Sequence, residues 1–391
     1  MARRVAGAGA AAGFVLAPLR SAAEKEEPMP PAEDFAALKG MPVALTGASG
    51  FIGGHLARAL LERGARLRVL ARHPRALTGL AGAEPIRGGL GDAAALDRLL
   101  DGAEILFHFA HDMRAGAAEN LSGLSALLAA AAKAGTPRIV AASSAVVEKN
   151  WPHGAMGAGA MPARPDPPIG YRGAKAAGEH ELAGHAAATG SVAISLRPTL
   201  VYGPGSRIWT AAIAERLIAG PVILPDPPGQ AFAVHVADVV RAALSAATAE
   251  VTGHAAVLIS GPEPVGWEEY YRAHIDILGR GEIVLQPREA LLARIGPPGP
   301  EREGQPLAAR LSALMRRIVP GAAVDALGAR LRALKPHPAG PQAPDPWLLD
   351  LYCAAGSIDP EPARTRIGFS PSVDFAAGME MTAPWLRQRY G

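Results

Sequence analysis

The chain has 391 residues, one cysteine and a formal net charge of +3 at pH 7. At about 150 residues per domain, this length predicts two domains, or one large α/β unit with an elaborated second lobe. Hydrophobic residues at 49% and charged residues at 19% are values typical of a globular protein and exclude disorder throughout. A lone Cys353 excludes an intrachain disulfide and a multi-cysteine zinc site. Six lysines and scattered arginines form no basic stripe, so we expect no nucleic-acid partner.

The first forty residues differ from the rest of the chain. Arg3 and Arg4 precede an Ala/Gly-rich stretch, which is followed by charged and then proline-rich residues. This order resembles a weak signal peptide. The apolar part is too short for a membrane span, which needs about 20 apolar residues. We therefore expect a flexible extension over residues 1–40 of a cytoplasmic protein, or a natural start at Met29 or Met41; export is the alternative.

From Met41 onward, short apolar runs alternate with stretches of helical period. The expected strands cover 43–45, 67–70, 105–109, 138–142 and 191–196, and the expected helices cover 54–63, 120–133 and 171–188. Strands alternating with helices of this length indicate βαβ units and a parallel sheet. The sequence therefore predicts an α/β fold, with a doubly wound parallel-sheet Rossmann domain over residues 41–202.

The pattern changes after Tyr202, where proline and glycine become frequent. One helical stretch, 235–249, is expected to rejoin the first domain, so that residues 233–260 return to it. The remaining residues, 203–232 and 261–391, would form a smaller, mixed C-terminal lobe that binds the substrate.

A glycine-rich turn follows the first expected strand and opens the first helix. It reads Thr46-Gly47-Ala48-Ser49-Gly50-Phe51-Ile52-Gly53. Glycines at such a turn let a dinucleotide pyrophosphate approach the backbone, where the helix supplies free N–H donors. So many glycines weaken a helix start unless close approach is needed. A tight turn without a ligand is the alternative, and we predict a dinucleotide site.

The end of the second strand bears on the choice between NAD and NADP. An acidic residue about 20 positions beyond the turn holds the ribose hydroxyls of NAD, whereas an arginine there accommodates the 2′-phosphate of NADP. This strand ends in Leu70-Ala71-Arg72-His73, without a carboxylate. The sequence favours NADP over NAD, with Arg72 on the phosphate; an ordinary exposed arginine is the alternative.

Tyr171 and Lys175 lie four residues apart at the start of an expected helix, so they share a face. An ammonium beside a phenol favours the phenolate, which suits the phenol to general acid and base catalysis. Ser143 and Ser144 follow the strand 138–142, at the carboxyl edge of the sheet where ligands bind. A hydroxyl there can bind a substrate carbonyl or alcohol, although serines also cap turns.

These motifs resemble those of the extended short-chain dehydrogenase/reductases, also called the NAD-dependent epimerase/dehydratase family. The resemblance runs from Met41 to Tyr390. Besides the glycine-rich turn, it rests on Phe107-His108-Phe109-Ala110, Asn120-Leu121-Ser122-Gly123, Ser143-Ser144-Ala145, Tyr171-Arg172-Gly173-Ala174-Lys175, Arg197-Pro198-Thr199-Leu200-Val201-Tyr202-Gly203-Pro204-Gly205 and Val234-His235-Val236-Ala237-Asp238.

The resemblance implies a mechanism and a set of cofactor contacts. Hydride would move between a nicotinamide and a secondary alcohol or ketone carbon, while Tyr171 transfers the proton, Lys175 tunes it and Ser144 orients the oxygen. Lys175 would also hold the nicotinamide ribose. The implied cofactor-binding residues are Thr46, Gly47, Ser49, Gly50, Phe51, Ile52, Gly53, Arg72, Leu90, Ala110, Lys175 and Pro198.

Departures from the family pattern bear on the substrate, which we expect to be a sugar-like or other small molecule. Many members have Gly-Asp-Leu near the adenine, where this chain has Gly88-Gly89-Leu90. Nucleotide-sugar members often have an arginine at the position of Ala231, where it holds the diphosphate. Ala145 and Val146 follow Ser144 where a dehydratase would have an acid or base. A simple reductase, a nucleotide-sugar 4-epimerase and a non-catalytic dinucleotide sensor or structural subunit remain as alternatives.

Two further expectations concern metals and self-association. His108 and His111 lie three residues apart, but no third ligand has suitable spacing, so we expect no metal. The apolar stretch from Leu121 to Ala132 could pair two copies of the chain, as helices of the first domain do in this family, which makes a homodimer possible.

Overall fold

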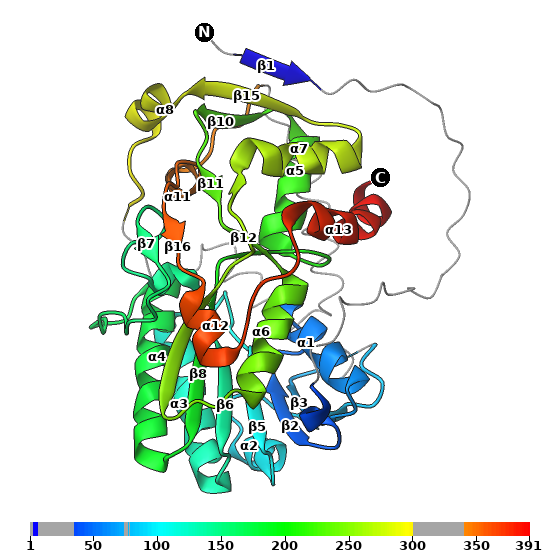
Figure 1. The fold of residues 1–391 in the computed structure, drawn as a ribbon, viewed down its shortest axis with the longest axis vertical. Helices are drawn as coiled ribbons and strands as arrows, with labels where there is room; N and C mark the ends of the chain where they lie inside the picture. The colour runs from blue at the N-terminus through cyan, green and yellow to red at the C-terminus, as the bar shows by residue number, and fades with distance from the viewer. Residues whose placement is uncertain (1–2, 7–34, 74–76, 78, 300–339) are drawn as a thin grey trace, which may run out of the picture.

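The computed structural model describes residues 3–6, 35–73, 77, 79–299 and 340–391. Its largest element is a seven-stranded parallel sheet with helices on both faces (Figure 1). In sheet order the strands are β13 (His254–Ile259), β8 (Val192–Pro198), β6 (Arg138–Ala142), β5 (Ile105–His108), β2 (Pro42–Thr46), β3 (Arg66–Ala71) and β4 (Glu84–Arg87). The predicted doubly wound Rossmann fold is confirmed.

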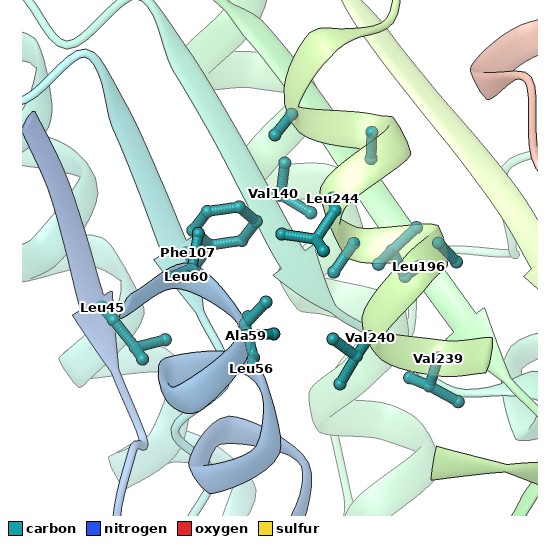
Figure 2. Packing of buried hydrophobic residues seen from close by; sticks show 14 of the residues in the cluster. Leu45, Leu56, Ala59, Leu60, Phe107, Val140, Leu196, Val239, Val240 and Leu244 are labelled. Carbon is teal, nitrogen blue, oxygen red and sulfur yellow. The ribbon is translucent and has the colours of Figure 1, made fainter. Parts of the chain in front are cut away.

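Strand residues alternate between two hydrophobic clusters because successive side chains of a strand point to opposite faces. Leu45 and Phe107 pack under α1 (Phe51–Glu62) and α6 (Val236–Thr248), as Figure 2 shows. Their neighbours Ala44 and Leu106 pack in a second cluster. That cluster lies under α2 (Ala93–Leu100), α3 (Ala117–Ala134) and α4 (Gly170–Thr189). Both faces of the sheet are therefore buried, as a parallel sheet requires.

The α3 leucines expected to pair two copies of the chain have partners within it. Leu124, Leu127 and Leu128 are buried in the second cluster. Helix α3 packs chiefly against α4. Pairing of two copies stays a prediction.

The second lobe is built on a smaller sheet and an aromatic core. Its three strands are ordered β1 (Arg3–Ala6), β15 (Glu282–Pro287) and β10 (Val222–Asp226). Trp267, Tyr270, Tyr271 and Tyr352 are fully buried together. The helices of the lobe are α5 (Ala212–Ala219), α7 (Trp267–Leu278), α8 (Arg288–Ile295), α11 (Pro346–Tyr352) and α13 (Phe375–Tyr390). Short strand pairs join β9 (Leu200–Tyr202) to β12 (Ala233–His235), β11 (Gln230–Ala231) to β14 (Val265–Gly266), and β7 (Ala155–Met156) to β16 (Ser357–Ile358).

Both ends of the chain differ in detail from the expected division into lobes. Residues 3–6 pair with β15 in the second lobe, and Leu38 is buried in the first cluster. Residues 7–34 of the expected extension lie outside the described residues. After residue 261, α12 (Glu361–Ile367) packs on β13, and Ile367 and Phe369 belong to the first cluster. The C-terminal segment therefore contributes to both lobes.

Asp238 anchors this C-terminal segment to α6. Its buried carboxylate accepts hydrogen bonds from the backbone N–H groups of Ser372 at 3.1 Å and Val373 at 3.0 Å. Arg241 donates to the same carboxylate at 2.6 Å and to the carbonyl of Ser370 at 3.3 Å. The segment between α12 and α13 is thus held by a buried ion pair.

Within the described ranges, none of the helices combines the length and apolar character that a membrane crossing requires.

We expect Asp238→Ala to lower the free energy of unfolding by about 3–5 kcal/mol, because it leaves Arg241 and two backbone donors without the buried carboxylate. Urea denaturation followed by circular dichroism measures this change. Asp374→Ala is the matched control, since the exposed Asp374 side chain caps α13 by accepting a hydrogen bond from the N–H of Ala377. Its loss should cost about 1 kcal/mol. Equal losses in the two variants would contradict the anchoring role of Asp238.

Candidate active site

The glycine-rich turn between β2 and α1 lies against the end of β5. Gly47 has a φ of +88°, and a Cβ there would lie 2.5 Å from the backbone nitrogen of Ala110. A Cβ on Gly53 would overlap the carbonyl of Gly47. Strands β2 and β5 are neighbours at which the chain order of the sheet reverses, the place where dinucleotides bind in such sheets. The close packing explains why these positions are glycine, and it places predicted residue Ala110 beside the turn.

The N-terminus of α1 is suited to an anion. Gly50 precedes the helix in an extended conformation, with Ser49 before it and Phe51 and Ile52 in the first turn. The first turn has no acidic residue. Unbonded N–H groups and the helix dipole favour a phosphate at such a terminus. The residues present therefore fit a dinucleotide pyrophosphate.

Thr46 and His108 join the ends of β2 and β5. Thr46 Oγ1 lies 2.8 Å from His108 Nδ1, and both side chains are buried. Burial, with a smaller contribution from Lys175, lowers the pKa of His108 to about 3. The imidazole is therefore neutral at physiological pH and serves as a hydrogen-bonding partner of Thr46.

Arg72 lies at the end of β3, next to β2 in the sheet. Its side chain is 74% exposed, and Nη1 lies 3.5 Å from Oδ2 of Asp112. This exposed contact is weak, so the guanidinium is free to turn toward a ligand. Leu90 lies after β4, close to Gly123 of α3. Asp112 was not predicted, since a loop carboxylate has no sequence pattern that marks it.

Tyr171 and Lys175 lie on the first turns of α4, as predicted. Lys175 Nζ donates a hydrogen bond to the carbonyl of Ala142, at the end of β6, over 2.7 Å. It lies 5.8 Å from the centre of the Tyr171 ring. Burial lowers the pKa of Lys175 to about 8, while the carboxylate of Glu179 opposes this shift. The structure thus brings a phenol and a desolvated ammonium together at the carboxyl edge of the sheet.

His111, for which no role at this site was predicted, is a neighbour of Tyr171 in the structure. Its ring lies 5.1 Å from that of Tyr171, nearly perpendicular to it. Burial, then the charge of Lys175, lowers the pKa of His111 to about 4, so it is neutral at physiological pH. Among the described residues, no group of three or more His, Cys, Asp or Glu side chains could hold a metal ion.

The two serines after β6 have different partners. The Ser143 hydroxyl donates a hydrogen bond to Glu179 Oε1 at 2.5 Å, so its proton is already used in that contact. Ser144 is 8% exposed, and its Oγ accepts a hydrogen bond of 3.4 Å from the N–H of Val146. This leaves the Ser144 hydroxyl proton available for a ligand. The difference favours Ser144 over Ser143 as the substrate-facing serine.

A cavity lies between α3, α4 and the ends of β5 and β6. Ala110, His111, Asn120, Lys175 and Glu179 are part of its lining. It brings predicted residues Ala110 and Lys175 together. Ser144 and Pro198 are not part of the lining, although Pro198 ends β8 nearby in the same sheet.

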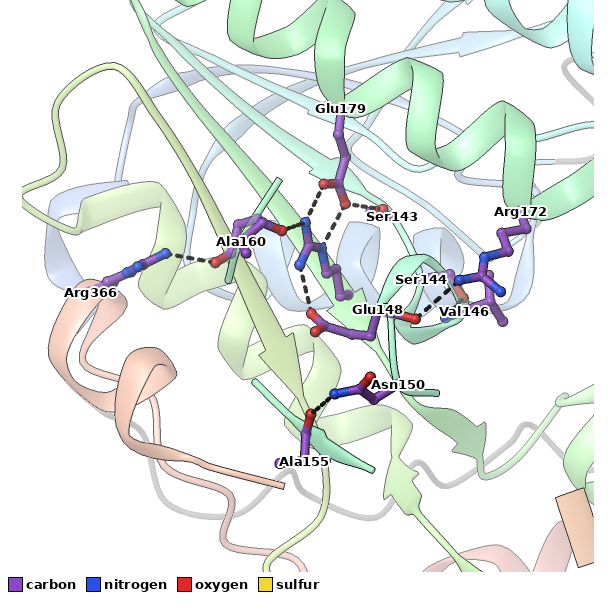
Figure 3. Close-up of polar contacts among 12 residues, drawn as sticks. Ser143, Ser144, Val146, Glu148, Asn150, Ala155, Ala160, Arg172, Glu179 and Arg366 are labelled. Carbon is purple, nitrogen blue, oxygen red and sulfur yellow. Dashed lines mark hydrogen bonds and ion pairs between the residues drawn. The ribbon is translucent and has the colours of Figure 1, made fainter. Parts of the chain in front are cut away.

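A buried arginine, Arg197, lies behind the serines, and the sequence predicts no role for it. Arg197 is 1% exposed and contacts Glu179 through Nε at 2.9 Å and Nη2 at 2.5 Å. Its Nη1 donates to Glu148 Oε1 at 2.6 Å. Figure 3 labels the partners of Arg197, which are Glu179, Glu148 and Ala160. The spacing in the sequence could have identified Glu179. It follows Lys175 by four residues and Tyr171 by eight, so all three lie on one face of α4.

Comparisons with known proteins agree with this geometry. The model of the NAD dependent epimerase/dehydratase family matches residues 43–259. The 2-alkyl-3-oxoalkanoate reductase of Stenotrophomonas maltophilia is 28% identical over 356 residues, which are 87% of this chain and 97% of that protein. The ceramide reductase of Caulobacter vibrioides is 30% identical over 269 residues, which are 66% of this chain and 74% of that protein.

Solved structures show the same fold. MoeE5 in complex with UDP-glucose and NAD superimposes with a TM-score of 0.62 at 22% identity, covering 90% of this chain and 100% of that chain. The UDP-glucose 4-epimerase of Thermotoga maritima gives a TM-score of 0.59 at 18% identity and covers 90% and 100% of the two chains. With the family model matching more than half of its length, the chain belongs to the NAD dependent epimerase/dehydratase family, the enzymes of which are NAD-dependent oxidoreductases and epimerases.

Proposed function

We propose that this chain is a reductase or dehydrogenase that interconverts a ketone and a secondary alcohol with a nicotinamide cofactor, NADP in preference to NAD. The observation that carries this proposal is the Lys175 ammonium, fixed by the carbonyl of Ala142 beside the ring of Tyr171. An ammonium has three N–H donors, of which this carbonyl takes one. The others suit the ribose hydroxyls and the tyrosine oxygen.

Each residue has one task in the proposed reaction. A bound nicotinamide supplies or accepts the hydride. Tyr171 gives a proton to the carbonyl oxygen during reduction and takes it back during oxidation. Lys175 stabilises the phenolate that remains after the transfer. The Ser144 hydroxyl donates a hydrogen bond to the same substrate oxygen and orients the carbon for hydride transfer.

The choice of a reductase over a nucleotide-sugar 4-epimerase rests on Ala231. This residue is fully buried in β11 and offers no charge to a diphosphate. The two relatives described above are named as reductases of an oxoalkanoate and of ceramide. The epimerase alternative draws on the fold alone, and tightly held NAD in the purified protein would favour it.

Replacing Tyr171 by phenylalanine should lower kcat for the NADPH-dependent reduction of a 2-alkyl-3-oxoalkanoate by about 10²–10⁴-fold, because the proton donor is lost. The Kd for NADPH, measured by fluorescence titration, should stay within about twofold of wild type. Tyr390→Phe is the matched control, since that hydroxyl contacts Glu215 on the surface of the second lobe. A Tyr171→Phe enzyme as fast as wild type would exclude the proposed mechanism. It would leave the non-catalytic sensor or structural subunit as an alternative.

Arg72→Ala tests the cofactor preference. Loss of a charge-assisted hydrogen bond to a 2′-phosphate should raise KM for NADPH on the order of tenfold and leave KM for NADH unchanged. Steady-state kinetics with the two cofactors measures both. Arg68→Ala, in the strand β3 that ends just before Arg72, should change neither, because Arg68 donates to the carbonyl of Arg98. If the two cofactors respond equally to Arg72→Ala, Arg72 does not bind the 2′-phosphate.

Gly47→Ala should abolish detectable NADPH binding, since the added Cβ meets the backbone of Phe109 and Ala110 and the residue needs a positive φ. Calorimetric titration of the folded variant measures the binding. Gly184→Ala on α4 is the control, because a Cβ there has open space and should stabilise the helix slightly. Unchanged affinity in Gly47→Ala would mean that the turn does not hold the cofactor.

A further inference from the structure

The cluster around Arg197 contains more negative than positive charge. One guanidinium is paired with two carboxylates, Glu179 and Glu148, and all three side chains are almost completely buried. Arg197 Nη2 also donates to the carbonyl of Ala160 at 2.9 Å. An excess charge in a protein interior is costly unless a counter-charge lies near it. One more cation near the cluster would therefore offset its excess negative charge.

Lys175 supplies that cation from the preceding turn of α4. The other titratable groups facing its ammonium are His108 and His111, from β5 and the loop after it, and Tyr171 on its own helix. Both histidines have lowered pKa values and are neutral at physiological pH. Among the described residues facing Lys175, Glu179 is thus the one that carries an opposite charge.

Glu179 also reaches the serine segment. Its Oε1 accepts the Ser143 hydroxyl proton at 2.5 Å, and Arg197 fixes both carboxylate oxygens. Glu148, the other partner of Arg197, follows the short helix that begins after Ser144. One carboxylate therefore contacts the segment of the proposed substrate serine and lies one turn from the proposed catalytic lysine.

We propose that Glu179 is a positioning residue of this active site: held by Arg197, its carboxylate keeps the Lys175 ammonium charged and fixes the Ser143–Ser144 segment. This inference rests on the function proposed above. Glu179 contacts no reacting atom in the proposed reaction, and it acts through Lys175 and Ser143.

The electrostatic effect has a defined sign. Burial lowers the pKa of Lys175, and the Glu179 carboxylate raises it. Removing that carboxylate lowers the pKa further, so the ammonium loses its proton at a lower pH. Activity that depends on the ammonium then declines at a lower pH on the alkaline side of the profile.

The first experiment compares Glu179→Gln with Glu148→Gln. Glutamine keeps the shape and can still accept a hydrogen bond from Arg197, and each variant removes one carboxylate from the same arginine. The kcat/KM for NADPH-dependent reduction of a 2-alkyl-3-oxoalkanoate is measured from pH 6 to pH 10. We expect the alkaline limb to move down by about one pH unit in Glu179→Gln and to stay in place in Glu148→Gln. Equal profiles for the two variants would overturn the proposal.

A second measurement needs no turnover. The chain has six lysines, so a ¹³C-lysine NMR titration gives few signals, and Lys175→Met identifies that of Lys175. We expect the titration midpoint of Lys175 to be lower in Glu179→Gln than in wild type. In Glu179→Asp, which keeps the negative charge, the midpoint should stay near that of wild type. This second variant serves as the test if glutamine disturbs folding. An unchanged Lys175 midpoint in Glu179→Gln refutes the proposed role of Glu179, even if the kinetics of Tyr171→Phe support the proposed reductase activity. Absence of ketone reduction by wild type refutes the proposed function, whereas the midpoint still decides the role of Glu179.

Discussion

The site depends on one backbone contact, that of Gly47 against Phe109 and Ala110. It holds the turn before α1 against the end of β5, at the point where neighbouring strands lead to helices on opposite faces. Any side chain at Gly47 would separate these segments, and Gly53 would overlap the turn from the other side if it had a Cβ. His108 and His111 are placed by the same strand end. The steric constraint on two glycines therefore positions both the proposed phosphate site and the surroundings of Tyr171.

Low solvent exposure gives the nearby charges their effect. Lys175, Glu179 and Arg197 lie where water screens them little, so each charge changes the protonation of its neighbours more than it would on the surface. The exposed pair of Arg72 and Asp112 shows the opposite case, since solvent weakens that contact and the arginine can exchange partners. The residues of the proposed chemistry thus lie in the buried part of the site. Arg72, the residue of the proposed cofactor preference, lies in the solvent-exposed part.

Much of the fold and part of the site follow from local patterns. The buried strands β2, β5, β6 and β8 are rich in apolar residues, and their positions were predicted within a few residues. Strand β4 was missed because it lies at the edge and buries only Ile86. The pairing of Glu179 with Arg197 could not be predicted, because residues from α4 and β8 meet only after the sheet has formed. The proximity of Tyr171 and Lys175 was predicted because their spacing already places them on one helical face.

The anchor formed by Asp238 has a consequence for how this family could be diversified. The segment it holds connects α12, which packs on the large sheet, to α13, which packs in the aromatic core of the other lobe. The chain therefore passes between the lobes several times, and the second lobe is not a contiguous C-terminal fragment. A chimera that replaces the second lobe would have to exchange 203–232 together with the segments on either side of α12, and leave α12 with its own sheet.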